Sequence, residues 1–249
     1  MADHSQMKLG RIRAPLDPRV PALRAVMQVP DAAPSEVDWY SRVVSWPMLL
    51  NDQIGDCTIA ALAHVVQQWT TYTDSSPVVM DDQETLWTYS AITGYRSNDP
   101  ATDQGAQCSD VLAYWRTAGV PTPTGGPDTL SGFASVGPRD LPAIKHAIAT
   151  FGNVYTGIAL PLSAQNEDVW ASTSDTPGSW GGHCVPLVGY NAIGPICVTW
   201  GALKQMTWAW WETYGEEAYA LLSHDWMRAT GTDPAGVDWV MLEQAMARL

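Results

Sequence analysis

The stretch NDQIGDCTIAALAHVVQQW, residues 51–69, places a cysteine behind a glycine, an aspartate and two side-chain amides. After the cysteine, apolar residues recur with helical spacing at Ile59, Leu62, Val66 and Trp69. This spacing predicts a buried helix over residues 58–73, with Cys57 at its first turn. Because a helix N-terminus favours a thiolate, Cys57 is either a nucleophile or an ordinary buried thiol.

The composition is that of a globular protein. Of the 249 residues, 46% are hydrophobic and 16% are charged, which suits one large domain or two lobes that share a cleft. No stretch reaches the ~18 consecutive apolar residues of a membrane-spanning helix. The first residues, MADHSQMKLGRIRAP, have no apolar core of a secretion signal. We therefore expect no membrane partner and no export by a signal peptide.

The four cysteines lie far apart in the sequence, at Cys57, Cys108, Cys184 and Cys197. Without a CxxC pair a disulfide framework is not expected, and the reducing cytoplasm is the predicted place of synthesis. The chain also lacks the close Cys and His spacing of zinc sites. Cys184 follows His183 on a predicted strand and so faces the opposite side from it. We predict no metal and no cofactor, and expect Cys108, Cys184 and Cys197 to be buried filling.

Charge is distributed unevenly along the chain. Residues 1–30 carry five basic and two acidic side chains, a net of +3, whereas the remainder carries eight basic and 24 acidic side chains, a net of −16. The acidic body would repel phosphate, which argues against nucleic acid as a partner. The proline-rich residues 1–36 are predicted to form an extended basic arm, which folds back on the acidic body or contacts a protein partner.

The part of the chain that follows the arm is rich in helix signals. Asp81 and Glu84 form a capping-box pattern at the start of DDQETLWTYSAITG, which ends in a glycine. A further helix is predicted over residues 109–119, with Ser109 as its N-cap. Another follows over residues 140–152, again between a polar cap and a glycine stop.

The second half of the chain changes to β-branched and aromatic runs, which are typical of strands. These are NVYTGIAL (153–160), HCVPLVGY (183–190), PICVTW (195–200) and EAYALLS (217–223). Helices followed by strands predict an α+β fold with two lobes, and the turn-rich PTPTGGPDTLSG (121–132) is the predicted crossing between them.

These patterns divide the chain into four expected parts. They are the arm at 1–36, a helical lobe with the Cys57 helix at 37–125, a β-rich lobe with His183 at 126–226, and a C-terminal helix or tail at 227–249. The last part contains VDWVMLEQAMARL, an amphipathic pattern behind Asp233 and Pro234, which are expected to be its cap and first-turn proline. We expect this helix to dock on the body or to bind a partner.

A cysteine nucleophile needs a base, and His183 has the best context for one. His64 shares a helix face with Cys57, but the seven residues between them rise ~10 Å, which is too far for a hydrogen bond. His183 stands in WGGHCVPLVGYN, where two glycines allow a close approach and a strand follows. Cys57 and His183 therefore have the order of a thiol enzyme.

Several of these segments, within residues 45–225, resemble the papain-like cysteine peptidases. The Cys57 helix resembles the nucleophile segment of that family, and ATDQGAQCSDVLAYWRTAGV resembles its glycine segment and tyrosine-bearing helix. LPAIKHAIATFGNVYTGIAL is similar to its next helix and strand, and GGHCVPLVGYN…VTWG to its histidine hairpin and Ser-Trp-Gly turn. The resemblance implies a two-lobed fold, with a helical N-terminal lobe, an antiparallel β C-terminal lobe and a cleft between them.

The sequence around the nucleophile departs from the family pattern. Papain-type enzymes read C-G-[SA]-C-[WY] there, whereas this chain reads GDCT. In this respect it resembles divergent papain-like proteins encoded by bacteriophages.

The resemblance implies roles for particular side chains. Cys57 matches the nucleophile, His183 the general base, and Trp200 the tryptophan that shields the histidine from water. Two amides compete as the oxyanion donor. Asn51 lies six residues before Cys57, which is the spacing of the family's glutamine, whereas Gln53 has the residue type of that glutamine but lies only four residues before Cys57.

Two features depart from the family. The family has an asparagine before its Ser-Trp-Gly turn, and this asparagine orients the histidine. At that position this chain has Val198 or Thr199. Only Thr199 can form a hydrogen bond with an imidazole, and Asn191 lies at the wrong end of the hairpin. Asp56 is an expected N-cap, worth ~1 kcal/mol to the helix, but its negative charge would oppose a thiolate at Cys57.

Three functions are consistent with these residues. The first is a peptidase that uses a Cys57–His183 dyad on extended peptides lying in the cleft. The second is a structural or weakly catalytic protein, such as a phage virion component, that binds protein partners through its basic arm and C-terminal helix. The third is an amidase for cell-wall peptides. The arm, residues 1–36, is then a propeptide removed on activation, a belt packed over the lobes, or a contact to a neighbouring subunit.

Overall fold

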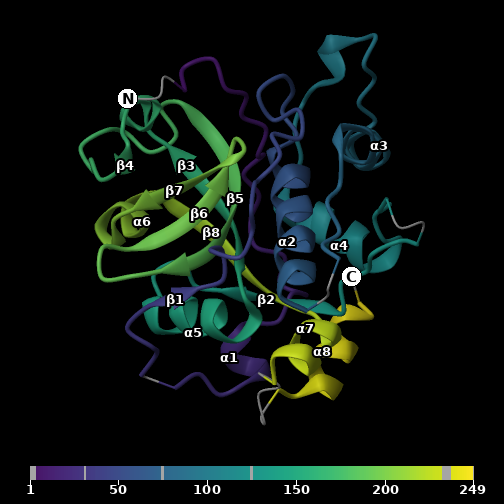
Figure 1. The fold of residues 1–249 in the computed structure, drawn as a ribbon, viewed down its shortest axis with the longest axis vertical. Coiled ribbons are helices and arrows are strands. Elements are labelled where there is room, and N and C mark those ends of the chain that lie inside the picture. Colours follow the sequence, from purple (N-terminus) through teal and green to yellow (C-terminus); the bar gives the residue numbers. More distant parts are fainter. Residues whose placement is uncertain (1–3, 31, 74–75, 124–125, 232–236, 249) are drawn as a thin grey trace.

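Helices and strands occupy separate regions of the structure. The computed structural model describes residues 4–30, 32–73, 76–123, 126–231 and 237–248. Helices α2, α3 and α4 lie on one side and a strongly twisted sheet lies on the other, with α2 facing β5 (Figure 1). The structure thus confirms the predicted α+β class.

The helical part is built around α2. The bounds of its helices are α2 Cys57–Thr73, α3 Asp82–Thr93, the 3-10 turn η1 Pro100–Thr102 and α4 Cys108–Thr117. Every residue of α2 from Cys57 to Trp69 is buried, because the helix packs against α3 and α4 on one side and against β5 on the other. The apolar spacing that predicted this helix reflects a segment buried on all sides.

The capping box predicted for α3 is present. The Asp81 side chain accepts hydrogen bonds from the Gln83 and Glu84 amides, and the Glu84 carboxylate accepts from the Asp81 amide. The predicted cap of α4 is wrong. Ser109 is already the second residue of that helix, because the Gln107 carbonyl accepts the Val111 N–H and starts the helix earlier.

The strands form one sheet in the order β2-β8-β3-β5-β6-β7-β4, and β1 also pairs with β5. Their bounds are β1 Val37–Asp38, β2 Gly132–Val136, β3 Val154–Leu160, β4 Val169–Trp170, β5 Gly181–Tyr190, β6 Pro195–Thr199, β7 Ala202–Met206 and β8 Gly215–Leu222. The neighbours are antiparallel apart from β4 and β7. Long β5 is therefore central, and its first residues face the N-terminal end of α2.

Further helical segments lie between the strands and after the last strand. They are α5 Leu141–Phe151, the 3-10 turn η2 Leu162–Gln165, α6 Trp208–Tyr214, α7 His224–Thr230 and α8 Trp239–Met246. α5 has the predicted Asp140 cap and Gly152 stop. α7 packs against α2, and α8 against β2. Among the described residues, none of the helices combines the length and apolar character needed to cross a bilayer.

The C-terminal helix is shorter than the sequence pattern indicates. α8 begins at Trp239, and its N-cap is Asp238, whose side chain accepts the Met241 N–H. The expected cap, Asp233 and Pro234, lies outside the described residues. The helix docks beside α1, a single helical turn at Leu23–Val26 in the arm.

Candidate active site

Cys57 is the first residue of α2 and its side chain is fully buried. The first turn forms because the Asp56 carbonyl accepts the N–H groups of Ile59 and Ala60. Burial raises the pKa of the Cys57 thiol, although hydrogen bonding from the Gly10 and Cys184 amides acts in the opposite direction. The sulfur is therefore a neutral thiol in this structure.

His183 is also fully buried, near the start of β5. Its Nε2 shares a hydrogen bond with Thr199 Oγ1 at 2.8 Å, and its Nδ1 has no partner among the described residues. Burial and then the nearby charge of Arg11 lower the pKa of His183 to about 3, so the imidazole is neutral.

Trp200 covers the imidazole. The two rings stack with their centroids 4.6 Å apart and an interplanar angle of 18°. Trp200 has a left-handed φ of 46°, which is rare for a bulky residue and turns the chain sharply after β6. Trp200 therefore lies directly over the ring of His183.

Thr199, rather than Val198, contacts the imidazole. The two residues alternate on β6, so their side chains point to opposite faces of the sheet. Val198 packs in a small apolar cluster with Trp46, Val188 and Ile196. Asn191 bonds Gln205 at the far end of the hairpin and takes no part in the arrangement around His183.

The two candidate oxyanion donors have different surroundings. Asn51 is buried, and its Nδ2 donates to Asp56 Oδ1 at 3.2 Å, next to Cys57. Gln53 is exposed. Asn51 follows Leu49 and Leu50, whose φ values of 58° and 64° form a strained turn before α2. The structure therefore brings the Asn51 amide, and not that of Gln53, to the buried start of the helix.

The side chain of Asp56 does not make the N-cap hydrogen bond expected for it. Its Oδ1 bonds the Asn51 amide, and its Oδ2 has no partner within the described part of the chain. Burial raises the pKa of this carboxyl well above its ordinary value, which disfavours its charged form. A charged Asp56 raises the pKa of the Cys57 thiol, so the burial of this carboxyl weakens the opposition to a thiolate that the sequence predicted.

The N-terminal arm crosses these residues. In Figure 1 its purple segment descends between the sheet and α2. The Gly10 carbonyl accepts the Ala106 N–H at 2.8 Å, the Ile12 N–H donates to the Ala106 carbonyl at 2.9 Å, and the Arg11 N–H donates to the Gly182 carbonyl at 3.1 Å. The arm is thus bonded both to the segment before α4 and to the start of β5.

Glycines allow the arm to lie this deep. A Cβ added to Gly10 would lie only 1.7 Å from the Gly55 carbonyl oxygen, and one added to Gly182 would lie 2.3 Å from the Arg11 carbonyl oxygen. Further along the arm, the His4 ring stacks on Trp200 with centroids 5.1 Å apart. The sequence left open an arm that folds back on the body or contacts a protein partner, whereas the structure places the arm over Cys57.

His64, the histidine on α2, takes no part in the arrangement around Cys57 and His183. His64 Nε2 donates to the Pro47 carbonyl at 2.9 Å, and burial lowers the pKa of His64 to about 4. His64 is therefore a hydrogen-bonded structural histidine, as expected from its position seven residues after Cys57 on the same helix. Cys108, Cys184 and Cys197 are buried as expected.

Comparisons with known proteins identify the fold. No family model and no curated protein matches the sequence. Solved structures do match, and they define the class: the chain has the fold of the papain-like cysteine peptidases.

Three of these structures show the extent of the similarity. Xylellain, a cysteine protease from Xylella fastidiosa, has a TM-score of 0.68 at 16% identity, covering 90% of this chain and 98% of its own. Digestive procathepsin L 3 of Tenebrio molitor has a TM-score of 0.61 at 15% identity, covering 88% and 77%. The bromelain protease of Ananas comosus has a TM-score of 0.54 at 14% identity, covering 76% and 98%.

Proposed function

We propose that the protein is a papain-like cysteine peptidase, with Cys57 as nucleophile and His183 as general base, and that its own N-terminal arm keeps it latent. The observation that carries this proposal is the arrangement around His183. Thr199 holds Nε2, Trp200 covers the ring, and Nδ1 is the polar atom left for the thiol. A histidine needed only for packing would not require this combination.

The chemistry follows from these positions. His183 Nδ1 takes the proton of the Cys57 thiol, and the sulfur attacks the carbonyl carbon of a peptide bond. The imidazolium returns the proton to the leaving amine as the C–N bond breaks, which leaves a thioester on Cys57. Water, deprotonated by His183, then attacks the thioester. The C–S bond breaks, the carboxylic acid leaves, and the imidazolium returns its proton to the Cys57 sulfur.

Two amide groups are our candidates for stabilising the oxyanion. One is the backbone N–H of Cys57 at the helix N-terminus, where the dipole favours negative charge. The other is the Asn51 side chain, whose Nδ2 has a second N–H beyond the one that it donates to Asp56. Asn51 is therefore our choice for this role over the exposed Gln53.

Latency follows from the position of the arm. Its backbone contacts Gly55 and Gly182 on either side of Cys57, so a substrate peptide has no room there. The same burial keeps the thiol and the imidazole neutral. Displacing or removing the arm would return water to both groups and allow the thiolate–imidazolium pair to form. The arm then acts as a propeptide or as a displaceable belt.

Hydrolysis by an arm-released variant tests the proposal. Gly10→Ala cannot seat its methyl group against Gly55, so the arm should leave the site while the full chain is kept. We expect this variant to cleave casein, and the wild type to cleave it much more slowly. Adding Cys57→Ala or His183→Ala should abolish the cleavage.

Two other outcomes would contradict a peptidase. Cleavage of cell-wall peptides but not of casein would assign the same residues to an amidase. Absence of cleavage on both substrates, with the arm shown to be displaced, would leave a non-catalytic scaffold that binds protein partners.

A further inference from the structure

Asp103 links two glycine segments beside the candidate active site. Its carboxylate accepts the Gly55 N–H, with both oxygens 3.1 Å from that nitrogen, and its Oδ1 accepts the Tyr89 hydroxyl at 2.6 Å. The same hydroxyl oxygen accepts the Gly105 N–H at 2.9 Å. A continuous chain of hydrogen bonds, the Asp103–Tyr89 link, therefore runs from Gly55, two residues before Cys57, to Gly105.

The surroundings of the link hold its two side chains in place. Asp103 follows η1, and its N–H donates to the Pro100 carbonyl at 3.1 Å. Tyr89 lies on α3, is fully buried and packs against Tyr95 with ring centroids 5.2 Å apart. Burial and then the hydrogen bond to Asp103 raise the pKa of Tyr89, so the phenol keeps the proton that it donates. The length of 2.6 Å is typical of a hydroxyl that donates to a carboxylate.

Both linked glycines contact the arm at Gly10. A Cβ added to Gly10 would lie 1.7 Å from the Gly55 carbonyl oxygen, and one added to Gly105 would lie 2.0 Å from the Gly10 carbonyl oxygen. Ala106, the residue after Gly105, donates its N–H to that Gly10 carbonyl at 2.8 Å. The link therefore joins the segment that carries Cys57 to a segment that binds peptide backbone.

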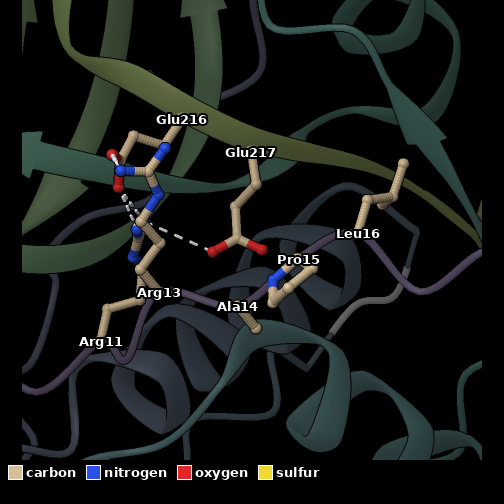
Figure 2. Close-up of a pocket in the computed structure, with 7 residues that line it drawn as sticks. All are labelled: Arg11, Arg13, Ala14, Pro15, Leu16, Glu216 and Glu217. Atoms are coloured by element: carbon tan, nitrogen blue, oxygen red, sulfur yellow. Dashed lines mark hydrogen bonds and ion pairs between the residues drawn. The ribbon is translucent and has the colours of Figure 1, made fainter.

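The arm is held on the sheet by different contacts. The Arg11 side chain is only 1% exposed and pairs with Glu216 and Glu217 (Figure 2). Both glutamates belong to β8, where a β-bulge makes Glu216 an extra residue relative to β3. These ion pairs involve neither Asp103 nor Tyr89, so the link acts on the helical side of the site.

We propose that Asp103, acting through Tyr89, is a positioning residue that fixes the separation between the Cys57 segment and the peptide-binding backbone of Ala106. This inference rests on the proposed peptidase function and adds to it two residues that act through the backbone. A peptide running in either direction offers a carbonyl and an N–H to Ala106, as the arm does. Because a misplacement of about 1 Å can lower a rate about a hundredfold, a small shift of either segment would slow the attack on a bound peptide.

Tyr89→Phe is the smallest change that breaks the link, since phenylalanine keeps the buried ring and loses only the hydroxyl. In the full-length Gly10→Ala protein, we expect it to lower kcat/KM for a fluorescent casein peptide about tenfold or more. Alkylation of Cys57 by iodoacetamide, which carries no peptide chain, should keep its rate and pH profile. Tyr95→Phe removes the hydroxyl of the neighbouring ring and is the matched control, which should change neither quantity.

Two substitutions of Asp103 test the other half of the link. Asp103→Ala removes the acceptor for Gly55 and Tyr89 and should lower kcat/KM at least as much as Tyr89→Phe. Asp103→Asn keeps an oxygen at Oδ1, which in the structure accepts both donors, and should retain most of the rate. Equal loss in the two Asp103 variants would contradict a role based on these hydrogen bonds.

Peptide binding separates this inference from the function on which it rests. In the full-length Gly10→Ala/Cys57→Ala protein, which lacks the nucleophile, Tyr89→Phe should weaken binding of the same peptide about tenfold, the value of one backbone hydrogen bond. Weaker binding without any cleavage by Gly10→Ala would remove the peptidase and retain the positioning of Ala106. Unchanged binding and kcat/KM would overturn the inference. So would an equal loss of kcat/KM and of the alkylation rate, because a destabilised fold would lower both.

Discussion

Thr199 stands where the family resemblance implies an asparagine, and its hydroxyl lies 2.8 Å from His183 Nε2. A hydroxyl forms one hydrogen bond to the ring, and the Trp200 stack supplies further restraint on the ring plane. The sequence placed Trp200 and either Val198 or Thr199 near His183, and the structure selects Thr199. The sequence was not sufficient to choose between Asn51 and Gln53, because that choice depends on a strained turn at Leu49 and Leu50 that no local pattern indicates.

Thr199→Val measures how much the hydroxyl contributes. Valine keeps the shape but cannot hold the imidazole, so kcat/KM of the Gly10→Ala protein should fall about tenfold, the value of one hydrogen bond. Thr213→Val, which loses a comparable hydroxyl bond to the Ala209 carbonyl on α6, is the control. Equal activity of the two variants would show that Thr199 does not orient His183.

His64 makes stability depend on pH. Its folded pKa of about 4 lies below the ordinary value of 6.5, so between these values the unfolded chain binds a proton that the folded chain does not. The contribution of His64 is thus fully present above pH 6.5 and is lost as the pH falls toward 4.

His64→Gln removes this dependence while keeping a donor for the Pro47 carbonyl. The free energy of unfolding of the wild type, relative to that of His64→Gln, should decrease by about 2 to 3 kcal/mol between pH 7 and pH 4.5. Urea unfolding at both values measures it. Parallel pH dependence in the two proteins would mean that the pKa of His64 in the folded protein equals its value in the unfolded chain.

At the scale of elements, sequence reasoning succeeded where the local signal agreed with the packing. The capping box of α3, the buried α2 and the four strands with β-branched runs were all predicted. β2, with the sequence GFASV, was missed because its small residues carry little strand preference. The aromatic run of α6 lacks a helical apolar stripe, and the bulge at Glu216 follows from pairing with β3, which sequence alone does not specify.

The contribution of the α3 capping box to stability can be measured with single substitutions. Asp81→Ala removes the acceptor for the Gln83 and Glu84 amides, so the free energy of unfolding should fall by about 1 kcal/mol. Asp82→Ala, one residue further along, removes an exposed carboxylate that is not the cap and should cost clearly less. Equal losses would assign the effect to charge near the helix terminus.

At the scale of the whole molecule, the basic arm and the acidic body are complementary. The charge difference predicted an arm that either folds back on the body or contacts a protein partner, and in the structure Arg11, Arg13 and Arg24 pair with glutamates and an aspartate of the body. Its path over Cys57 could not be predicted. That path depends on contacts between glycine backbones, Gly10 with Gly55 and Gly182 with the carbonyl of Arg11, which have no sequence signature.

Limited proteolysis reports whether the arm is seated. In the wild type, Lys8, Arg11 and Arg13 lie in a segment whose backbone is bonded to Ala106 and Gly182. Trypsin should cut Gly10→Ala there about tenfold faster or more, because cleavage follows the population of the open form. Gly126→Ala, whose new methyl group meets nothing within 4 Å, should be cut at the wild-type rate.

The most direct test of a latent Cys57–His183 site is the rate at which a peptidyl epoxide labels Cys57, mapped by mass spectrometry between pH 5 and 9. We predict slow labelling of the wild type, rapid labelling of Gly10→Ala near neutral pH, and loss of that gain when His183→Ala is added. Labelling of Gly10→Ala that is no faster at Cys57 than at Cys197, or that is indifferent to His183, would contradict the account.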